Sequence, residues 1–204
     1  MTMLMIVPVQ GDVAMIAEFE GICPKLAEKT FIADGAKVIG KVTMKEFSSL
    51  WVNVVARGDV NAIEIGCYSN VQDNTVVHVA DDHPTLIGDY VTVGHNAVIH
   101  GCIIEEHCLI GMGAIILTGA VIGKGSIVAA GAVVKERQII PPHSLVVGVP
   151  GKVVRFVPEE WDSIHAQAVK YKTLWRKWRK LLRGADGENS KQTKTNKNKV
   201  DKAL

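Results

Sequence analysis

Three histidines, His78, His95 and His100, lie close together in the sequence and could hold a metal ion. Neutral imidazole is a common zinc ligand, and three protein ligands plus an open position for water are typical of catalytic zinc sites. A single histidine on a strand is more often an ordinary polar surface residue. Whether these three form a site therefore depends on the elements that carry them.

Aliphatic residues recur every six positions around the histidines, and four positions after each one the residue is nearly always small or β-branched. Two inward positions per six residues are too few for a helix and too regular for loops. This period predicts a parallel β-helix, in which each hexad forms one wall and three hexads complete a triangular coil. The period does not fix the hand of the coil. The aliphatic positions are Ile32, Val38, Met44, Leu50 and Ala56; Ile65, Val71 and Val77; Ile87, Val93 and Ile99; and, after a one-residue slip, Ile104, Ile110, Ile116, Ile122, Val128 and Val134.

The phase of the hexads places the histidines. Val77 and Ile99 occupy the same wall of adjacent coils, so His78 and His100 stack on the outside of that wall, about 4.8 Å apart along the axis. His95 lies on the preceding wall and faces roughly 120° away by the threefold geometry of the coil. One chain then cannot easily bring all three to one ion. A trimer, in which His95 comes from a neighbouring chain, solves this with the fewest assumptions.

Four segments carry a family resemblance: Ala-Arg-Gly-Asp at 56–59, Asn-Val-Gln-Asp at 70–73, Val-His at 77–78 and Val-Gly-His-Asn-Ala-Val-Ile-His-Gly-Cys at 93–102. With them, the stretch from about Phe31 to Arg155 resembles the gamma-class carbonic anhydrases, in their short-loop, hexapeptide-repeat subgroup. The resemblance implies a left-handed parallel β-helix and a homotrimer. It also implies a metal ion, zinc or alternatively iron or cobalt, held between subunits by His78, His95 and His100.

The resemblance further implies an activity and four catalytic residues. The activity is reversible hydration of carbon dioxide to bicarbonate by a metal-bound hydroxide at the trimer interface. Arg57 and Asp59 would form an ion pair across the interface, which suits the rigid donor fork of arginine. Gln72 and Asp73 would lie beside the metal-bound water and orient it.

Two departures from the family pattern put the rate of such a reaction in doubt. Val60 stands where the archetype of the class has a glutamate, and the link between His78 and Ile87 is too short for the long acidic loop that carries a second one. Hydration requires a proton to leave the metal-bound water in every cycle. His83, in the short link, could serve as the relay because of its pKa.

Two other function classes stay open. One is a hexapeptide-repeat acyltransferase that uses coenzyme A, because the same fold supports both chemistries; it needs one catalytic histidine and would leave two stacked imidazoles unexplained. The other is an accessory protein that binds metal but turns over weakly, which the missing glutamates favour.

The rest of the chain predicts a simple organisation. Residues 1–157 form the β-helix domain with an N-terminal extension and a terminating loop, and residues 158–183 form an amphipathic helix with aromatic residues on its apolar stripe. Residues 184–204 form a basic tail that has few apolar side chains and should be disordered. The basic residues of the helix suit a solvated face better than a nucleic-acid or membrane surface. Without a recognisable leader or membrane span, we expect a cytoplasmic protein.

Overall fold

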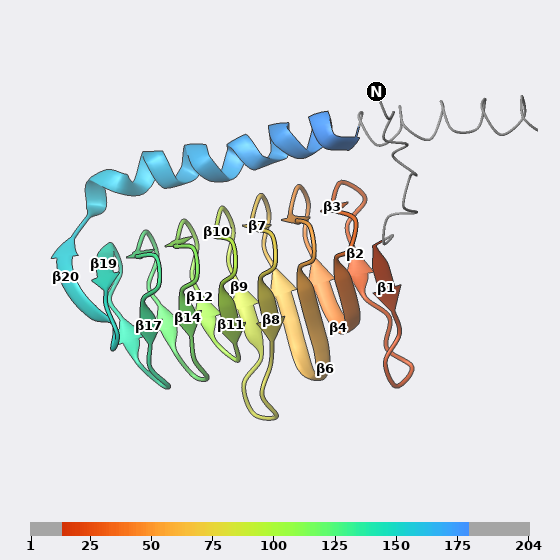
Figure 1. The fold of residues 1–204 in the computed structure, drawn as a ribbon, viewed down its shortest axis with the longest axis horizontal. Helices are drawn as coiled ribbons and strands as arrows, with labels where there is room; N and C mark the ends of the chain where they lie inside the picture. The colour runs from red at the N-terminus through yellow and green to blue at the C-terminus, as the bar shows by residue number, and fades with distance from the viewer. Residues whose placement is uncertain (1–13, 180–204) are drawn as a thin grey trace, which may run out of the picture.

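The computed structural model describes residues 14–179. Within them the chain forms a left-handed parallel β-helix of about seven turns, followed by a C-terminal helix, as predicted (Figure 1). The expected N-terminal extension up to residue 13, the last turn of the helix and the basic tail at 184–204 lie outside the described residues.

The prism has three walls, which we name A, B and C. Wall A contains β1 (Met15–Ala17), the first part of β4 (Lys37–Met44) and of β6 (Val55–Ile65), then β8 (Val76–His78), β11 (Val98–His100), β14 (Ile115–Ile116) and β17 (Val133–Val134). Wall B contains β2 (Lys25–Leu26), the second part of β4 and β6, then β9 (Thr85–Ile87), β12 (Ile103–Ile104), β15 (Val121–Ile122) and β18 (Ile139–Ile140). Wall C contains β3 (Phe31–Ile32), β5 (Ser49–Leu50), β7 (Asn70–Val71), β10 (Thr92–Val93), β13 (Leu109–Ile110), β16 (Ile127–Val128), β19 (Ser144–Val147) and β20 (Lys152–Phe156).

The predicted hexad positions form the core. From Val38 to Val134 every one of them is at most 3% exposed, and Ile32, near the N-terminal end, is partly buried. The small residues four positions later are also buried, and their hydroxyls are satisfied by backbone carbonyls: Ser69 donates to Gly88 at 2.6 Å and Thr75 to Gly94 at 2.9 Å. Large aliphatic residues thus fill the prism, while small ones fit its corners without leaving unpaired polar atoms.

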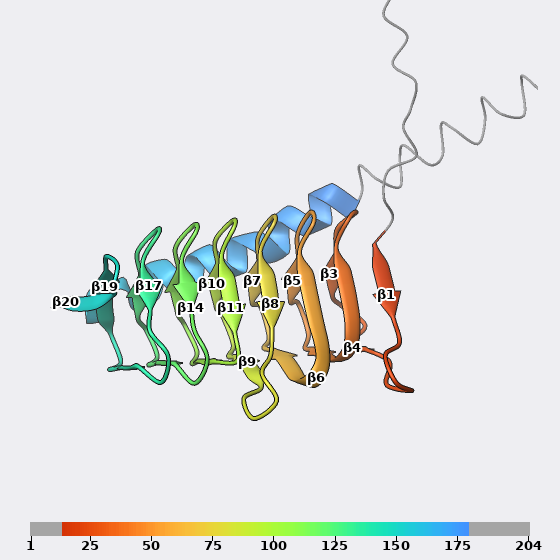
Figure 2. The ribbon, with the colours of Figure 1, turned by 60° about the horizontal axis from the view of Figure 1, so that its bottom comes forward.

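Three irregularities of the hexad pattern fall at one corner, where wall A turns into wall B. In β6, residues 59–62 occupy the place that Lys41 alone occupies in β4. One coil later, the segment between β8 and β9 extends as a loop, which projects from the lower edge of the prism (Figure 2). In the next coil, β11 and β12 are joined by only Gly101 and Cys102.

The C-terminal helix begins with the 3-10 turn η1 (Pro158–Glu160) and is α-helical over 161–179. It runs back along the prism from its C-terminal end (Figure 1) and buries Ile164, Ala168 and Trp175. Trp175 stacks on Phe31 of wall C, with the ring centroids 5.9 Å apart. The apolar stripe predicted from the sequence therefore packs on the prism. Among residues 14–179, no helix is both long and apolar enough to cross a membrane.

An aromatic column runs along the corner between walls B and C and contacts the helix. Each member stands three residues after an inward residue of wall B and has a positive φ: Phe47, Tyr68, Tyr90, His107 and His143. Among the first four members, the ring centroids of consecutive residues lie 4.8 to 4.9 Å apart. Gly125 takes this place in the coil between those of His107 and His143, and Trp161 of the helix fills the gap. The centroid of its ring lies 3.9 Å from that of His107 and 5.6 Å from that of His143. The column thus fixes where the helix begins.

Candidate metal centre

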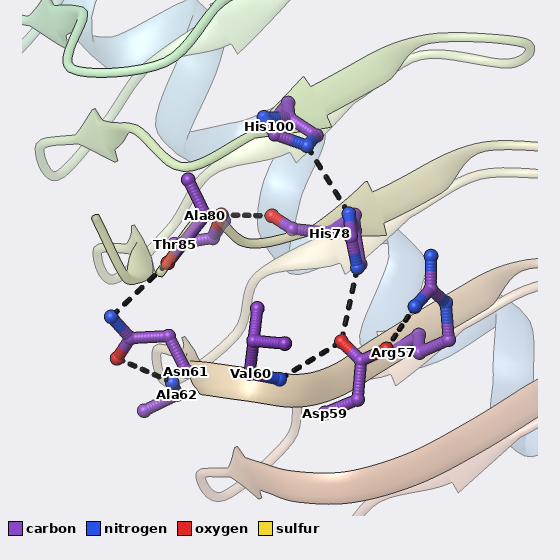
Figure 3. Close-up of polar contacts among 9 residues, drawn as sticks. All are labelled: Arg57, Asp59, Val60, Asn61, Ala62, His78, Ala80, Thr85 and His100. Atoms are coloured by element: carbon purple, nitrogen blue, oxygen red, sulfur yellow. Dashed lines mark hydrogen bonds and ion pairs between the residues drawn. The ribbon is translucent and has the colours of Figure 1, made fainter. Parts of the chain in front are cut away.

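His78 and His100 end the neighbouring strands β8 and β11 and are paired in register on wall A. Their rings lie side by side, with His78 Nδ1 3.1 Å from His100 Nε2 (Figure 3). Each follows an inward aliphatic residue, so the alternation of side chains along a strand turns both imidazoles outward. The convergence predicted from the hexad phase is what the structure shows.

The second nitrogen of each ring has its own partner from an adjacent coil. His78 Nε2 lies 3.0 Å from Asp59 Oδ1, and His100 Nδ1 lies 2.9 Å from Thr118 Oγ1. Because an ionised carboxylate can only accept hydrogen bonds, His78 donates through Nε2, and in a neutral imidazole this leaves the lone pair on Nδ1, toward His100. When the hydroxyl of Thr118 accepts from His100 in the same way, both lone pairs point to one place.

Asp59 is held in its charged form by several groups around it (Figure 3). Although burial acts to raise its pKa, hydrogen bonds from His78 and from the Val60 amide, with the positive charge of Arg57, lower the pKa of Asp59 below its ordinary value. Arg57 pairs with Asp59 within the chain, two residues away, whereas the family resemblance implied a pair across subunits.

Gln72, Asp73 and His95 form a second cluster at the other edge of wall A, where wall C turns into it. His95 Nδ1 lies 2.7 Å from Asp73 Oδ2 in the adjacent coil. Gln72 is only 5% exposed, and its amide donates to Asn70 at 3.1 Å. A cavity of about 280 Å³ lies beside them and is also lined by Tyr171 of the helix. Burial and the charge of Asp73 raise the pKa of Tyr171, so its hydroxyl stays protonated.

The seven residues singled out from the sequence therefore form two half-sites. Arg57, Asp59, His78 and His100 lie at one edge of wall A, and Gln72, Asp73 and His95 lie at the other. Among residues 14–179, no three His, Cys, Asp or Glu side chains of one chain come close enough together to hold an ion. His95 thus does not join His78 and His100 within the chain.

The donor set nevertheless suits a zinc ion. Two imidazole nitrogens bound to tetrahedral zinc lie about 3.3 Å apart, close to the separation of the two nitrogens that face each other here. Both rings have an outer hydrogen-bond partner, as metal-ligating histidines almost always do. The pair supplies two ligands, so a third must come from elsewhere.

Sequence reasoning missed three residues that shape these half-sites. Thr118 carries the contact to His100, and Tyr171 lines the cavity beside Gln72. Asn61, in the irregular part of β6, donates through its amide to the carbonyls of Ala80 and Asp81 at 3.2 and 3.1 Å and so fixes the loop after His78. The hexad pattern gives no sign of them, since the first lies in a turn, the second on the helix and the third in an irregular segment.

Some of the known proteins similar to this chain carry transferase names. The bacterial transferase hexapeptide family (six repeats) matches residues 101–136. A proposed acetyltransferase of Bacillus cereus is 40% identical, with a TM-score of 0.80 over 82% of this chain and 98% of that one.

Two relatives found by sequence carry the name carbonic anhydrase. A probable carbonic anhydrase of Methanocaldococcus jannaschii is 57% identical over 73% of this chain and 94% of its own length. A carbonic anhydrase of Geobacillus kaustophilus is 43% identical over 72% of this chain and 80% of its own length. Both relatives exceed 40% identity, and the alignments span more than two thirds of this chain and of each relative. The chain therefore belongs to the gamma carbonic anhydrase family.

Proposed function

We propose that this protein catalyses the reversible, metal-dependent hydration of carbon dioxide at the boundaries between the subunits of a homotrimer. The observation that carries the proposal is the division of the site: His78 and His100 converge at one edge of wall A, while His95 stands at the other. A ring of three identical chains brings the first edge of each chain to the second edge of the next, because a heterologous contact closes under threefold symmetry.

Zinc is the metal that this donor set favours, with iron or cobalt as alternatives, and such an ion lets water act as a nucleophile near neutral pH. The chain's own residues would bind the ion and orient the reacting molecules. His78 and His100 bind with their facing nitrogens, and the carboxylate of Asp59 fixes the ring of His78. Gln72, which is buried and held by Asn70, presents its amide oxygen from a rigid position and can orient a water molecule or a bicarbonate hydroxyl.

The sharpest test of the shared site is complementation between two inactive variants. His95→Ala and His100→Ala should each lose stoichiometric metal binding and carbon dioxide hydration while keeping the β-helix, because the core does not include these residues. When the two variants are co-expressed, a boundary that takes His78 and His100 from one and His95 from the other is intact. Random mixing should restore metal and activity at about a quarter of the boundaries.

If all three ligands came from one chain, mixing would restore nothing, and the proposed division of the site would be wrong. Full metal occupancy in either single variant would remove that histidine from the site. Metal-loaded wild-type protein that hydrates no carbon dioxide would contradict the activity itself.

Acyl transfer is the second candidate, favoured by the likeness to the Bacillus cereus protein. In such an enzyme one histidine must act as a free base. Here the second nitrogens of His78 and His100 are both bonded, and the remaining ones face each other. Transfer of an acetyl group from acetyl coenzyme A by the metal-free protein would favour this alternative over hydration.

A further inference from the structure

Thr118, which contacts His100, belongs to a coil that carries none of the residues implied by the family resemblance. Thr118 follows β14, one coil beyond His100, and its Oγ1 lies 2.9 Å from His100 Nδ1. Asp59 reaches His78 from the preceding coil in the same manner. Each of the two converging imidazoles therefore has a hydrogen-bond partner in an adjacent coil, a carboxylate for His78 and a neutral hydroxyl for His100.

The surroundings of Thr118 fix the direction of its hydroxyl. A side chain at Gly101 would begin 3.3 Å from Thr118 Cγ2 and 3.2 Å from His83 Cβ, so the methyl group packs into the space that this glycine leaves. A side chain at Gly119 would begin 3.1 Å from His83 Nε2. His83 thus lies against both glycines, with its Cβ near Gly101 and its ring near Gly119. Because a β-branched side chain has few χ1 choices, placing the methyl there leaves the hydroxyl toward His100.

The backbone around Thr118 is also held firmly. The amide of Arg137 donates to the carbonyl of Thr118 at 2.9 Å, and the amide of Gly119 donates to the carbonyl of Gly101 at 2.7 Å. These bonds tie the turn to the coils on either side of it. The hydroxyl is therefore presented from a fixed point relative to β11, which carries His100.

Resting on the proposed function, we propose that Thr118 is a positioning residue for His100. Its hydroxyl accepts a hydrogen bond from Nδ1 and so directs Nε2 toward Nδ1 of His78, where a divalent ion would bind. Outer partners of ligating histidines fix the tautomer and the ring orientation, and losing one typically costs 10–100-fold in metal affinity or activity. The hydroxyl does this without adding a second negative charge to the one that Asp59 places beside His78.

The test compares Thr118→Val, which keeps the shape and removes the hydroxyl, with Thr118→Ser, which keeps the hydroxyl. Zinc affinity of the full-length protein is measured by competition with a chromophoric chelator, and the cobalt-substituted protein is compared by its visible spectrum. Thr118→Val should bind zinc roughly 10–100-fold more weakly and show an altered cobalt spectrum. Thr118→Ser should stay close to wild type in both, and Thr43→Val on wall B serves as the control.

Wild-type zinc affinity in Thr118→Val would overturn the inference while leaving the proposed function intact. Equal losses in the valine and serine variants would also overturn it, because they would indicate packing rather than hydrogen bonding. Should the valine variant fold poorly, Thr118→Ala provides a second variant without the hydroxyl and should show the same loss of affinity. If the wild-type trimer binds no divalent metal, the proposed function fails and this inference falls with it.

Discussion

Gly125 and Gly113 share a backbone conformation but differ in what surrounds them, which makes them a matched pair for testing the role of the aromatic column. Both have φ of +67°. A Cβ at Gly113 would meet nothing within 4 Å, whereas a Cβ at Gly125 would lie 2.5 Å from His143 Nδ1 and 3.0 Å from Trp161 Cε3. Alanine at either site adds the same left-handed strain, but only at Gly125 does it collide with the rings that hold the helix.

The expected costs follow from these two terms. An alanine in the left-handed region costs about 1–2 kcal/mol, which is the whole effect expected for Gly113→Ala. Overpacking a filled site adds roughly 1–3 kcal/mol, so Gly125→Ala should lower the free energy of unfolding by that much more. The ring of His143, which the new methyl group would approach most closely, must move to relieve the clash, and its contact with Trp161 should weaken.

Chemical denaturation at a fixed protein concentration, followed by tryptophan fluorescence, measures the difference between the two variants. His143→Ala in the Gly125→Ala background should remove most of the extra cost, because the ring that the new methyl group meets most closely is then absent and neighbouring substitutions that share a contact are not additive. Equal destabilisation of the two glycine variants, within about 0.5 kcal/mol, would refute the view that position 125 needs a glycine to admit the rings of His143 and Trp161.

Three further predictions concern pH, metal and proton transfer. Burial and the neighbouring His165 lower the pKa of His107. The docking of the helix should therefore be fully stabilised above pH 6.5 and weaken as the pH falls through the folded-state pKa of His107. Unfolding followed by fluorescence should show a flatter pH dependence in His107→Gln. Removing the metal with a chelator should cost about 2.7 kcal/mol of stability per site relative to protein in zinc at 100 times its dissociation constant, measured by the shift in the denaturation midpoint. The rate of carbon dioxide hydration by the wild type should rise with the concentration of imidazole buffer. Val60 is 53% exposed, and Val60→Glu should raise the rate in dilute buffer. A wild-type rate that does not depend on buffer would show that another group carries the proton.

The sequence alone predicted the β-helix and the placement of His78 and His100, because both depend only on a repeating alternation. Each predicted inward residue from Val38 to Val134 is buried where the count put it, and a residue that follows one must point outward. The same phase put His95 on a different wall. These predictions needed no knowledge of loops, since a strand paired in register carries its side chains with it.

The contacts that the sequence did not predict lie where the repeat is interrupted or where distant segments meet. β20 pairs antiparallel with β19 in the stretch where the sequence predicted only a terminating loop. His107 and His165 lie 58 positions apart and meet only because the helix folds back along the prism. Thr118 reaches His100 from a turn, whose direction depends on the packing of the glycines and of His83 around it.

The corner between walls A and B gathers the longer part of β6, the loop after β8 and the short link after β11, while the strands on either side keep their pairing. In a stacked fold each coil is held mainly by its two neighbours, so a change of chain length at a corner need not shift the rest. Residues can then be added or deleted within a few ångströms of the two histidines without disturbing the spacing between them. For protein engineering, this corner is a place to graft a longer segment carrying a proton-accepting side chain, with the ligand geometry left as it is.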